Sequence, residues 1–593
     1  MARLSLSERI RLNRLAFDRA RRSVSVRILH SPLLRWRYGP RAADRLLIVP
    51  QELRPADPSF ANEMSDGHFG LGGALAVLKT GSPFDLPPPT PAWERELHGF
   101  GWLRHLRADG GQHARDIALA LTADWLRRYP RRPGIAWQPN VVARRVISWI
   151  GNAALLLEDV PQTDYKRIAN SLGEQFVYLA ATWRDVPAGH PRLLCLIGLL
   201  FADLCIAGHD RHLEDIQGTV TQEIGRQILP DGGHVSRNPG ILVELLLDLL
   251  PLRACFAARR QKMPAALEET IRRMMPMLRY LRLGDGSLAR FNGVGAQPRA
   301  ALATVLAYGD PVVPALAEAP QSRYVRLHRG DTVVIVDAGP PPPLELAGEA
   351  HAGCLSLEMS TGAQAIFVNA GAPAPADQDW RAVSRATASH NTLCLGNKSS
   401  SKLIRHPLLE KIVEAAPIRF PNAVEAQATQ TTGGSGLEAF HDGYVRKFGV
   451  LHRRSLVLSA DGRGFSGVDR IEPRRGKLRL ARDIPFAIHF HLHPAIACAP
   501  GDRPATADLH LRKGERWRFT ATGAELSIEE SVHLADFSGP RRSMQIVLRG
   551  ASFGQTEVHW KVEKVAAAPS ESADANEDLP AETGAEEASG SAT

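Results

Sequence analysis

The sequence predicts an α+β multidomain protein in which an α-helical domain precedes an antiparallel β-sandwich. The chain has 593 residues, too many for a single hydrophobic core. Between about residues 90 and 310, apolar residues recur at the three- and four-residue spacing of helices. From about residue 320 the pattern changes to short strands separated by Gly and Asp turns. That order of patterns predicts helices first and a sandwich second.

The first segment, residues 1–89, is a basic amphipathic lead-in that ends in a Pro/Gly-rich stretch at 79–89. Charged and apolar residues alternate at the N-terminus, without the uninterrupted apolar core of a signal peptide. The longest apolar stretch, 193–202, ends at Asp203 and is too short to span a bilayer. We therefore expect no transmembrane segment and see no export signal.

Residues 90–315 form the predicted helical domain. Ile168, Leu172, Phe176, Leu179 and Trp183 follow one another at offsets of four, four, three and four, which places them on one helix face. Similar stretches recur along the domain with short Gly/Pro loops between them. Successive antiparallel helices build either a solenoid or a closed toroid, and the absence of a fixed-period repeat disfavours a regular solenoid.

Residues 320–565 form the predicted β-sandwich. Residues 324–337 have the pattern of a hairpin, and Asp461-Gly462 marks a turn after the strand at 455–459. His489, His491 and His493 alternate with apolar residues, so they share one strand face, which we expect to be solvated rather than an anion-binding row. The remaining residues, 566–593, hold seven acidic and no basic residues and are expected to be disordered.

Charge and cysteine content restrict the partners. The net charge is +9, and the body is more basic still because the tail is acidic. A basic body favours a polyanionic partner such as nucleic acid, acidic polysaccharide or an anionic membrane surface, unless it reflects a genome that favours Arg. No nucleic-acid recognition motif is present, so nucleic acid is not predicted. The six cysteines have no CxxC spacing and indicate no disulfide framework, and Cys195 and Cys205 are expected to be packed thiols.

The most informative block runs from Glu349 to Asn391. It reads Glu-Ala-His351-Ala-Gly, then a strand ending in Phe-Val-Asn369-Ala-Gly, then Ser-His390-Asn-Thr. Small flanking residues allow a ligand to approach the backbone. The block resembles the β-domain of the heparinase II/III family of polysaccharide lyases. The resemblance implies an N-terminal α/α toroid followed by a heparinase II/III-like β-sandwich.

The same resemblance implies β-elimination at a uronic acid, in which a base removes the C5 proton and an acid protonates the leaving oxygen. His190, in a loop before a helix, would neutralise the substrate carboxylate, with Arg192 beside it. His234, Arg237 and Asn238 lie at the next helix start, where an anion is favoured.

The resemblance also adds Trp137 as a face for sugar stacking. The alternative for the two helix-start motifs is a surface histidine and a polar capping loop.

Several positions depart from the family pattern. Gly189 replaces an Asn, Ile241 stands where the family has its catalytic Tyr, and Gly353 replaces an Asp. Glu349 replaces a catalytic His and would act as a base only if burial or neighbours raised its pKa. Tyr444 is a candidate replacement acid.

The family's metal ligands correspond to His351, Asn369 and His390, which raises zinc as a cofactor. Two imidazoles and a carboxylate suit zinc, whereas the neutral Asn369 is a weaker ligand.

The leading hypothesis is a lyase that cleaves an acidic, uronic-acid-containing polysaccharide by β-elimination. One alternative is a catalytically altered or inactive member that binds polysaccharide. Another is a toroid-type glycoside hydrolase using Asp231 and Glu349 as its carboxylate pair. The resemblance implies the cell envelope or periplasm, and the absence of an export signal keeps the cytoplasm as the alternative. The sequence leaves the oligomeric state open.

Overall fold

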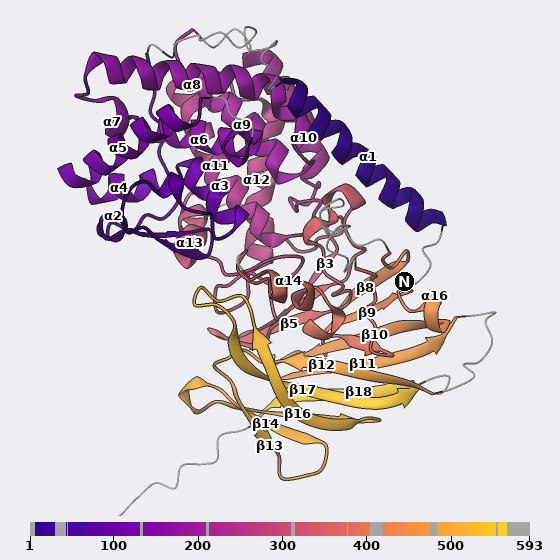
Figure 1. Ribbon diagram of the computed structural model, residues 1–593. Coiled ribbons are helices and arrows are strands. Elements are labelled where there is room, and N and C mark those ends of the chain that lie inside the picture. Colours follow the sequence, from indigo (N-terminus) through magenta and orange to yellow (C-terminus); the bar gives the residue numbers. More distant parts are fainter. Residues whose placement is uncertain are drawn as a thin grey trace, which may run out of the picture.

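The computed structural model describes residues 6–29, 43, 45–130, 134–208, 213–309, 315–375, 377–403, 419–474, 483–552 and 556–565. Helices occupy the N-terminal half and β-sheets the C-terminal half, as Figure 1 shows. The predicted fold class, an α/α toroid followed by an antiparallel β-sandwich, is confirmed. The acidic tail at 566–593 lies outside the described residues.

The helical half begins with a long helix and a small hairpin, which the sequence reading did not predict. The helices and the two hairpin strands are α1 (Leu6–Leu29), α2 (Phe60–Ser65), β1 (His68–Leu71), β2 (Ala74–Val77), α3 (Pro91–Gly99), α4 (Leu103–Asp109), α5 (Gln112–Arg128), α6 (Pro139–Gly151), α7 (Ala153–Leu157), α8 (Gln162–Thr182), α9 (His190–Cys205), α10 (Leu213–Gln227), α11 (Pro239–Ala258), α12 (Ala265–Tyr280) and α13 (Arg299–Ala307).

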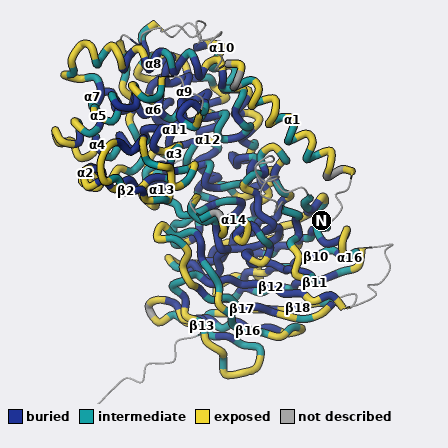
Figure 2. The backbone as a smooth tube through the Cα atoms, viewed as in Figure 1, coloured by how far each residue is buried: buried dark blue, intermediate teal, exposed yellow. Residues whose placement is uncertain are grey.

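Helices α9 and α11 lie at the centre of the toroid because they are apolar on nearly every face. The core around them is dark in Figure 2 and includes Cys195 and Cys205, the packed thiols expected from the sequence. The ring centroid of Trp125 lies about 6 Å from those of Trp137 and Trp149 in an aromatic cluster. No helix in the described part of the chain is both long and apolar enough to cross a bilayer.

The C-terminal half is built from antiparallel sheets. One sheet has eight strands in the order β13-β14-β15-β18-β11-β10-β9-β8, and two sheets of four have the orders β16-β17-β12-β7 and β3-β4-β5-β6. The strands are β3 (Tyr324–Arg329), β4 (Thr332–Asp337), β5 (Leu357–Thr361), β6 (Gln364–Phe367), β7 (Leu393–Leu395), β8 (Val424–Thr431), β9 (Gly434–His441), β10 (Val450–Ser459), β11 (Gly464–Pro473), β12 (Ile484–His491), β13 (Ala497–Pro500), β14 (Thr506–His510), β15 (Arg516–Thr522), β16 (Glu525–His533), β17 (Arg541–Ser552) and β18 (Thr556–Lys564). Both predicted hairpins are present, as β3–β4 and β10–β11.

One strand prediction is wrong. His489 and His491 are buried on β12, not solvated, because the segment around Ala388 packs over their end of the strand. His491 makes hydrogen bonds from both ring nitrogens, to the Ser531 hydroxyl at 2.8 Å and the Ala388 carbonyl at 2.9 Å. His489 and His491 are therefore interior polar residues, whereas His493 is only half-buried.

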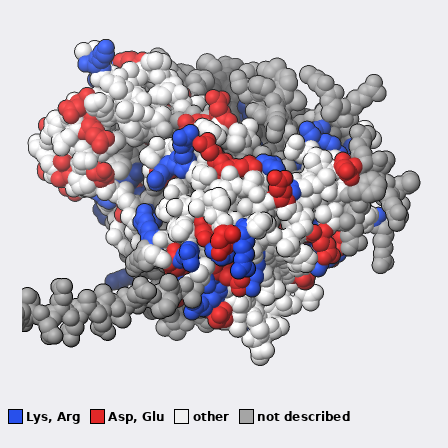
Figure 3. Space-filling model, turned by 90° about the horizontal axis from the view of Figure 1, so that it is seen from below, with Lys and Arg blue, Asp and Glu red and all other residues white. Residues whose placement is uncertain are grey.

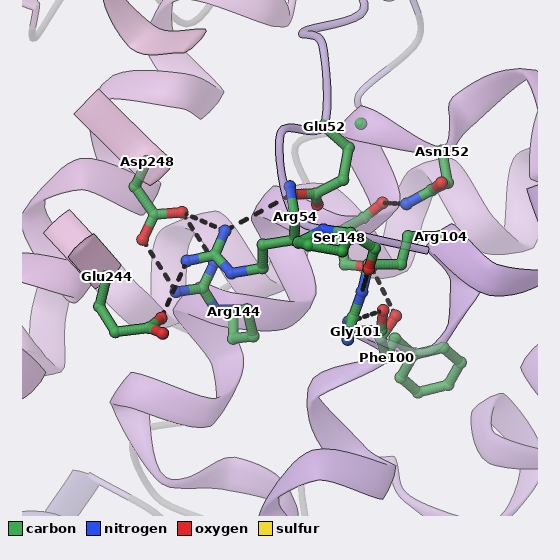
Figure 4. Close-up of polar contacts among 12 residues, drawn as sticks. Glu52, Arg54, Phe100, Gly101, Arg104, Arg144, Ser148, Asn152, Glu244 and Asp248 are labelled. Atoms are coloured by element: carbon green, nitrogen blue, oxygen red, sulfur yellow. Dashed lines mark hydrogen bonds and ion pairs between the residues drawn. The ribbon is translucent and has the colours of Figure 1, made fainter. Parts of the chain in front are cut away.

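Each half contains a buried carboxylate held by guanidinium groups. In the toroid, Asp248 on α11 accepts hydrogen bonds from Arg144 on α6 and from Arg54 of the N-terminal segment, each at 2.8 Å, as Figure 4 shows. In the sandwich, Asp469 accepts hydrogen bonds from Arg454, His452 and Trp560 at 2.7–3.0 Å. In both cases the opposite charges offset the cost of burying the carboxylate.

The basic surplus of the chain does not form a single patch on the face seen in Figure 3. Lysine and arginine side chains lie there beside aspartate and glutamate. Ion pairs also join exposed charges of the sandwich half, as in Arg549 with Glu529 at 2.8 Å and Arg518 with Asp502 at 2.9 Å. Net charge alone therefore does not identify this face as a polyanion site.

Candidate functional site

The loop before α9 contacts the sandwich half at the start of the informative block. Gly189 has φ 97°, and a Cβ on it would lie 2.8 Å from Leu346 Cδ2. Leu346 belongs to a short 3₁₀ helix, Leu344–Glu349, which ends at the predicted base. A side chain at position 189 would therefore be strained by the left-handed backbone and would displace the end of the Leu346 side chain. The glycine that departs from the family pattern has a structural reason.

A second glycine brings Asn238 and Glu349 together. Gly293 has φ 99°, and a Cβ there would lie 2.9 Å from Glu349 Cβ and 3.0 Å from Asn238 Nδ2. Asn238 caps α11, since its Oδ1 accepts a hydrogen bond from the Gly240 N–H at 2.9 Å. Glu349 is 57% exposed and pairs with Arg381 Nη2 at 2.7 Å. We call this place, formed by Gly189, Asn238, Gly293, Leu346 and Glu349, the junction.

His234 lies behind the junction and is fully engaged. Its Nδ1 and the Ser236 hydroxyl are 2.7 Å apart, and its Nε2 lies 3.1 Å from Gln227 Oε1. The Gln227 amide in turn donates to the Gly189 carbonyl at 3.1 Å. Burial lowers the pKa of His234 to about 3, so the ring is neutral at ordinary pH. These bonds make His234 a support for the His190 loop.

His190 is the first residue of α9 and is half-buried. Its Nε2 is buried and makes no hydrogen bond within the described residues. Burial lowers its pKa, with Glu244 and Asp248 opposing the shift. Arg192, two residues on, donates to the Val186 carbonyl at 3.1 Å and lies 3.8 Å from Glu223. Arg192 Nε is likewise buried and without a hydrogen-bond partner among the described residues.

Arg237 does not face a substrate. It is buried, has a left-handed backbone with φ 59°, and forms an ion pair with Asp337 at 2.5 Å. Its other N–H groups donate to main-chain carbonyls of Ser322 and Gly339 at 3.0–3.1 Å. The side chain therefore ties the toroid to β4, and the predicted substrate-binding role is corrected to a structural one.

Trp137 and Tyr444 are also interior. The Trp137 indole N–H donates to the Tyr129 carbonyl at 3.0 Å, and its ring packs edge-on against Tyr178. The Tyr444 hydroxyl donates to the Leu393 carbonyl at 2.9 Å, and burial raises its pKa well above the usual range. A buried Trp offers no stacking face, and a buried Tyr with a raised pKa is a poor proton donor to a sugar oxygen.

The residues at the family's metal positions, His351, Asn369 and His390, make hydrogen bonds within the protein. His351 Nδ1 and His390 Nε2 lie 3.0 Å apart, and His390 Nδ1 is 2.7 Å from the Ala386 carbonyl. Asn369 Oδ1 accepts from the Asn391 N–H at 3.0 Å. Among the described residues no group of three His, Cys, Asp or Glu side chains is placed to hold a metal. Two imidazoles and an engaged amide do not fit a zinc site, so no chemistry is assigned to a metal.

Asp231, the other carboxylate of the hydrolase alternative, is engaged as well. Its Oδ2 accepts from the N–H groups of Gln321 and Ser322 at 2.9 and 2.6 Å, and its Oδ1 accepts from Gly233. A carboxylate with several donors in a buried turn anchors the chain rather than activating water. The geometry gives no support to an Asp231–Glu349 pair.

The sequence reading missed Glu358 on β5. Its side chain is fully buried, accepts from the Asn369 N–H at 2.8 Å and lies 3.5 Å from Arg290. Burial raises the pKa of Glu358 to about 7. The sequence does contain a signal for it, since Glu358 is a single carboxylate between Leu357 and Met359. A strand that is covered on both faces has no solvated side, so a charged residue within it must be buried.

The junction therefore joins both halves of the predicted site but presents few reactive groups. Glu349, Asn238 and the His190 loop come together, whereas His234, Arg237, Tyr444 and Asn369 are used internally. Ile241, at the place of the family's Tyr, packs against the toroid core. For contact with a ligand the junction offers the Glu349 carboxylate and the Asn238 amide, with Arg381 paired to Glu349. Among the described residues of the junction, no acid is placed to protonate a leaving oxygen.

Known proteins with related sequences or structures agree with this architecture. Heparinase III superposes with a TM-score of 0.67 at 13% identity, covering 88% of this chain and 86% of that one. A heparan sulfate lyase HepC mutant from Pedobacter heparinus superposes with a TM-score of 0.58 at 15% identity, covering 94% and 89%. At these identities the likeness concerns the fold.

Sequence comparison adds a relative whose name does not describe a lyase. FtsZ-localized protein C of Caulobacter vibrioides is 29% identical over 529 residues, covering 87% of this chain and 89% of the relative. Residues 311–561 match the family described as heparinase II/III-like, C-terminal. The C-terminal domain of the chain is therefore heparinase II/III-like, and the whole chain shares its toroid-and-sandwich fold with heparinase III.

Proposed function

We propose that this protein localises with FtsZ and has the heparinase fold without its β-elimination chemistry. The observation that carries the second part is the internal use of the groups that elimination needs. His234 has both ring nitrogens bonded, Arg237 is held by Asp337, and the Tyr444 hydroxyl is buried. The sequence similarity to FtsZ-localized protein C, together with the name of that relative, supports the first part.

This proposal takes the cytoplasmic alternative over the cell envelope or periplasm. The name of the Caulobacter relative supports that choice. FtsZ, rather than an acidic polysaccharide, is then the expected partner. The toroid and sandwich would act as a rigid body whose buried ion pairs maintain its shape.

Localisation is tested by imaging a fluorescent fusion of the full chain together with labelled FtsZ in the source cell. We expect the two signals to coincide in cells. We also expect purified, immobilised FtsZ to capture the chain. A diffuse signal in cells that show FtsZ structures would overturn the localisation part. The lyase part is tested separately, so the two can fail independently.

Elimination is tested by incubating the protein with a panel of uronate polymers and following the ultraviolet absorbance of the unsaturated product. A heparinase III preparation serves as the positive control on its own substrate. We expect no increase in absorbance from this chain. Turnover that Glu349→Gln abolishes would instead support a lyase whose base is Glu349.

A polysaccharide-binding role at the junction is the second candidate, because one observation favours it. Asn238 and Glu349, from different halves of the chain, flank Gly293 at the junction where the resemblance predicts a site. An exposed carboxylate next to an amide can contact a sugar. Binding of a uronate polymer without cleavage, lost in Glu349→Gln and Asn238→Ala, would support a polysaccharide-binding role at the same place.

A further inference from the structure

Two histidines of the sandwich and an arginine of the helical half lie close together outside the junction. His493 follows β12 and His533 ends β16, two strands that flank β17 in their sheet (Figure 1). The centroids of the two imidazole rings are 5.9 Å apart. Arg290 lies in the segment between α12 and α13. We call these three residues the His-Arg cluster, and none of them belongs to the junction.

The segment after β6 brings the arginine to the end of β16. The Leu534 N–H donates to the Ala370 carbonyl at 2.7 Å, which fixes this segment beside the strand end. Gly371 has φ 76°, and a Cβ there would lie 2.5 Å from Ala535 Cβ and 3.4 Å from Arg290 Cδ. The aliphatic part of the arginine therefore passes directly beside the residues that follow His533.

The protein uses little of the hydrogen-bonding capacity of Arg290. The side chain is 10% exposed, and its ion pair with Glu358 is long, 3.5 Å between Nη1 and Oε2. A guanidinium carries five N–H groups. Within the described residues, the Arg290 side chain makes no polar contact other than this pair. Most of its N–H groups remain for a ligand.

Each imidazole also has a ring nitrogen that the protein leaves open. His493 Nδ1 accepts a hydrogen bond from the Ala495 N–H at 3.1 Å, so the proton of the neutral ring lies on Nε2. His533 is 4% exposed, and its buried Nδ1 makes no hydrogen bond of good geometry within the described residues, although the Ala535 main chain is near. A buried polar atom without a good partner costs free energy that a ligand can recover.

The charge of Arg290 reaches both rings. Burial lowers the pKa of His533 to about 3, and the Arg290 guanidinium adds to that shift. Burial also lowers the pKa of His493 to about 4, again with Arg290 as the next cause. Both imidazoles are therefore neutral at ordinary pH and present N–H groups beside a fixed positive charge.

The neighbouring charges do not fill this site. Asp285 faces His493 and Asp536 faces His533. Each of the two aspartates accepts two hydrogen bonds through Oδ1 within its own turn, at 2.6–3.0 Å. Asp536 Oδ2 also pairs with Arg541 at 3.2 Å. No group of three ligating side chains in the described part of the chain is placed to hold a metal ion, so the donors of the cluster fit an anion.

We propose that the His-Arg cluster binds a phosphate-type oxyanion, either free or as a phosphate monoester. A tetrahedral oxyanion presents oxygens in several directions, so one ion can accept hydrogen bonds from the guanidinium and from both imidazoles. The bound ion would join Arg290 of the helical half to His493 and His533 of the sandwich. This inference does not depend on the proposed FtsZ localisation or on the absence of elimination.

The test is isothermal titration calorimetry of the full chain with inorganic phosphate and with phenyl phosphate, with acetate as the planar comparison anion. We expect saturable phosphate binding at one site, at least about tenfold tighter than acetate binding. Phenyl phosphate that binds at least as tightly as inorganic phosphate would identify the ligand as a monoester. Binding of inorganic phosphate alone would identify the free ion.

Variants of the cluster should weaken phosphate binding. Arg290→Lys keeps the positive charge beside Glu358 but removes the planar fork, and we expect a loss of about tenfold. His493→Leu removes one N–H donor from a half-buried position that tolerates the change, and we expect a loss of about fivefold. The shift of thermal unfolding by phosphate should shrink in the same variants, which also shows that each of them folds.

Matched controls separate the cluster from general anion binding. His559→Leu, at a side chain 56% exposed on β18, and Arg542→Lys, at a side chain 90% exposed, should leave phosphate binding unchanged. Phosphate binding no tighter than acetate binding, or unchanged in both Arg290→Lys and His493→Leu, would overturn the proposal and leave an adventitious ion only. Zinc binding that His493→Leu abolishes, without phosphate binding, would overturn it in favour of a metal.

Discussion

The two buried carboxylates, Asp469 in the sandwich and Asp248 in the toroid, have the same chemistry but different origins. Asp469 and Arg454 are direct partners in the β10–β11 register, and both side chains are 0% exposed. Asp248 instead joins Arg144 and Arg54, which are 104 and 194 residues away and 21% and 13% exposed. Strand register builds the first pair, whereas docking of a distant N-terminal segment builds the second. Clusters made by local pairing can be sealed more completely from water.

The largest effect should come from Asp469→Asn. Removing the charge leaves the Arg454 guanidinium buried without its counter-ion, so we expect a loss of about 3–5 kcal/mol in the free energy of unfolding, measured by urea titration. Asp502→Asn, at an exposed ion pair with Arg518, is the matched control and should cost under about 1 kcal/mol. Equal losses in the two variants would contradict the difference in burial.

The same carboxylate predicts acid sensitivity. Arg454 and the hydrogen bonds from His452 hold the pKa of Asp469 below its ordinary value of 3.8, despite burial. Its contribution to stability is therefore present above about pH 3.8 and is lost as pH falls below that value. Asp469→Asn should remove this part of the acid dependence.

Glu358→Gln should give the next largest effect, with the opposite pH dependence. Burial raises the pKa of Glu358 from 4.5 to about 7, so the folded protein keeps this proton where the unfolded chain releases it. Wild-type stability relative to the Gln variant is then highest below pH 4.5 and falls by about 3 kcal/mol as pH rises to 7. Urea titrations of both proteins across pH 4–8 measure the difference, and parallel curves would exclude the raised pKa.

Asp248→Asn should cost less than Asp469→Asn, about 2–3 kcal/mol, because Arg54 and Arg144 keep some contact with water when the carboxylate is lost. The N-terminal segment around Arg54 should also loosen from the toroid. Hydrogen exchange of residues 45–54 measures that loosening directly. Exchange rates unchanged from wild type would show that Asp248 does not hold the segment.

Glu349→Gln should have the smallest effect on stability. Its pair with Arg381 is a surface ion pair, with side chains 57% and 35% exposed, so we expect a change under about 1 kcal/mol. Thermal unfolding compares it with wild type, and Asp502→Asn again provides the surface reference. A larger loss would mean that Glu349 is part of the structural contact between the halves.

Prediction from sequence succeeded where local pattern decides the outcome. Ile168, Leu172, Phe176 and Leu179 form the buried face of α8, as their spacing indicated. It failed for His489 and His491, because a period of two shows that they share a face but not which layer covers that face. It failed for Trp137 for a similar reason, since an indole suits either a core or a sugar-binding surface.

The sequence by itself determined the kinds of elements, their order and the heparinase II/III resemblance, because apolar periodicity and turn residues act over a few positions. Only the tertiary structure decided which polar residues remain available to a ligand. Arg237 is held by carbonyls 85 and 102 residues away, and Gly189 has a left-handed backbone where its loop meets Leu346 of the other half. A buried polar group must find partners wherever the fold brings them, and a motif does not record those partners.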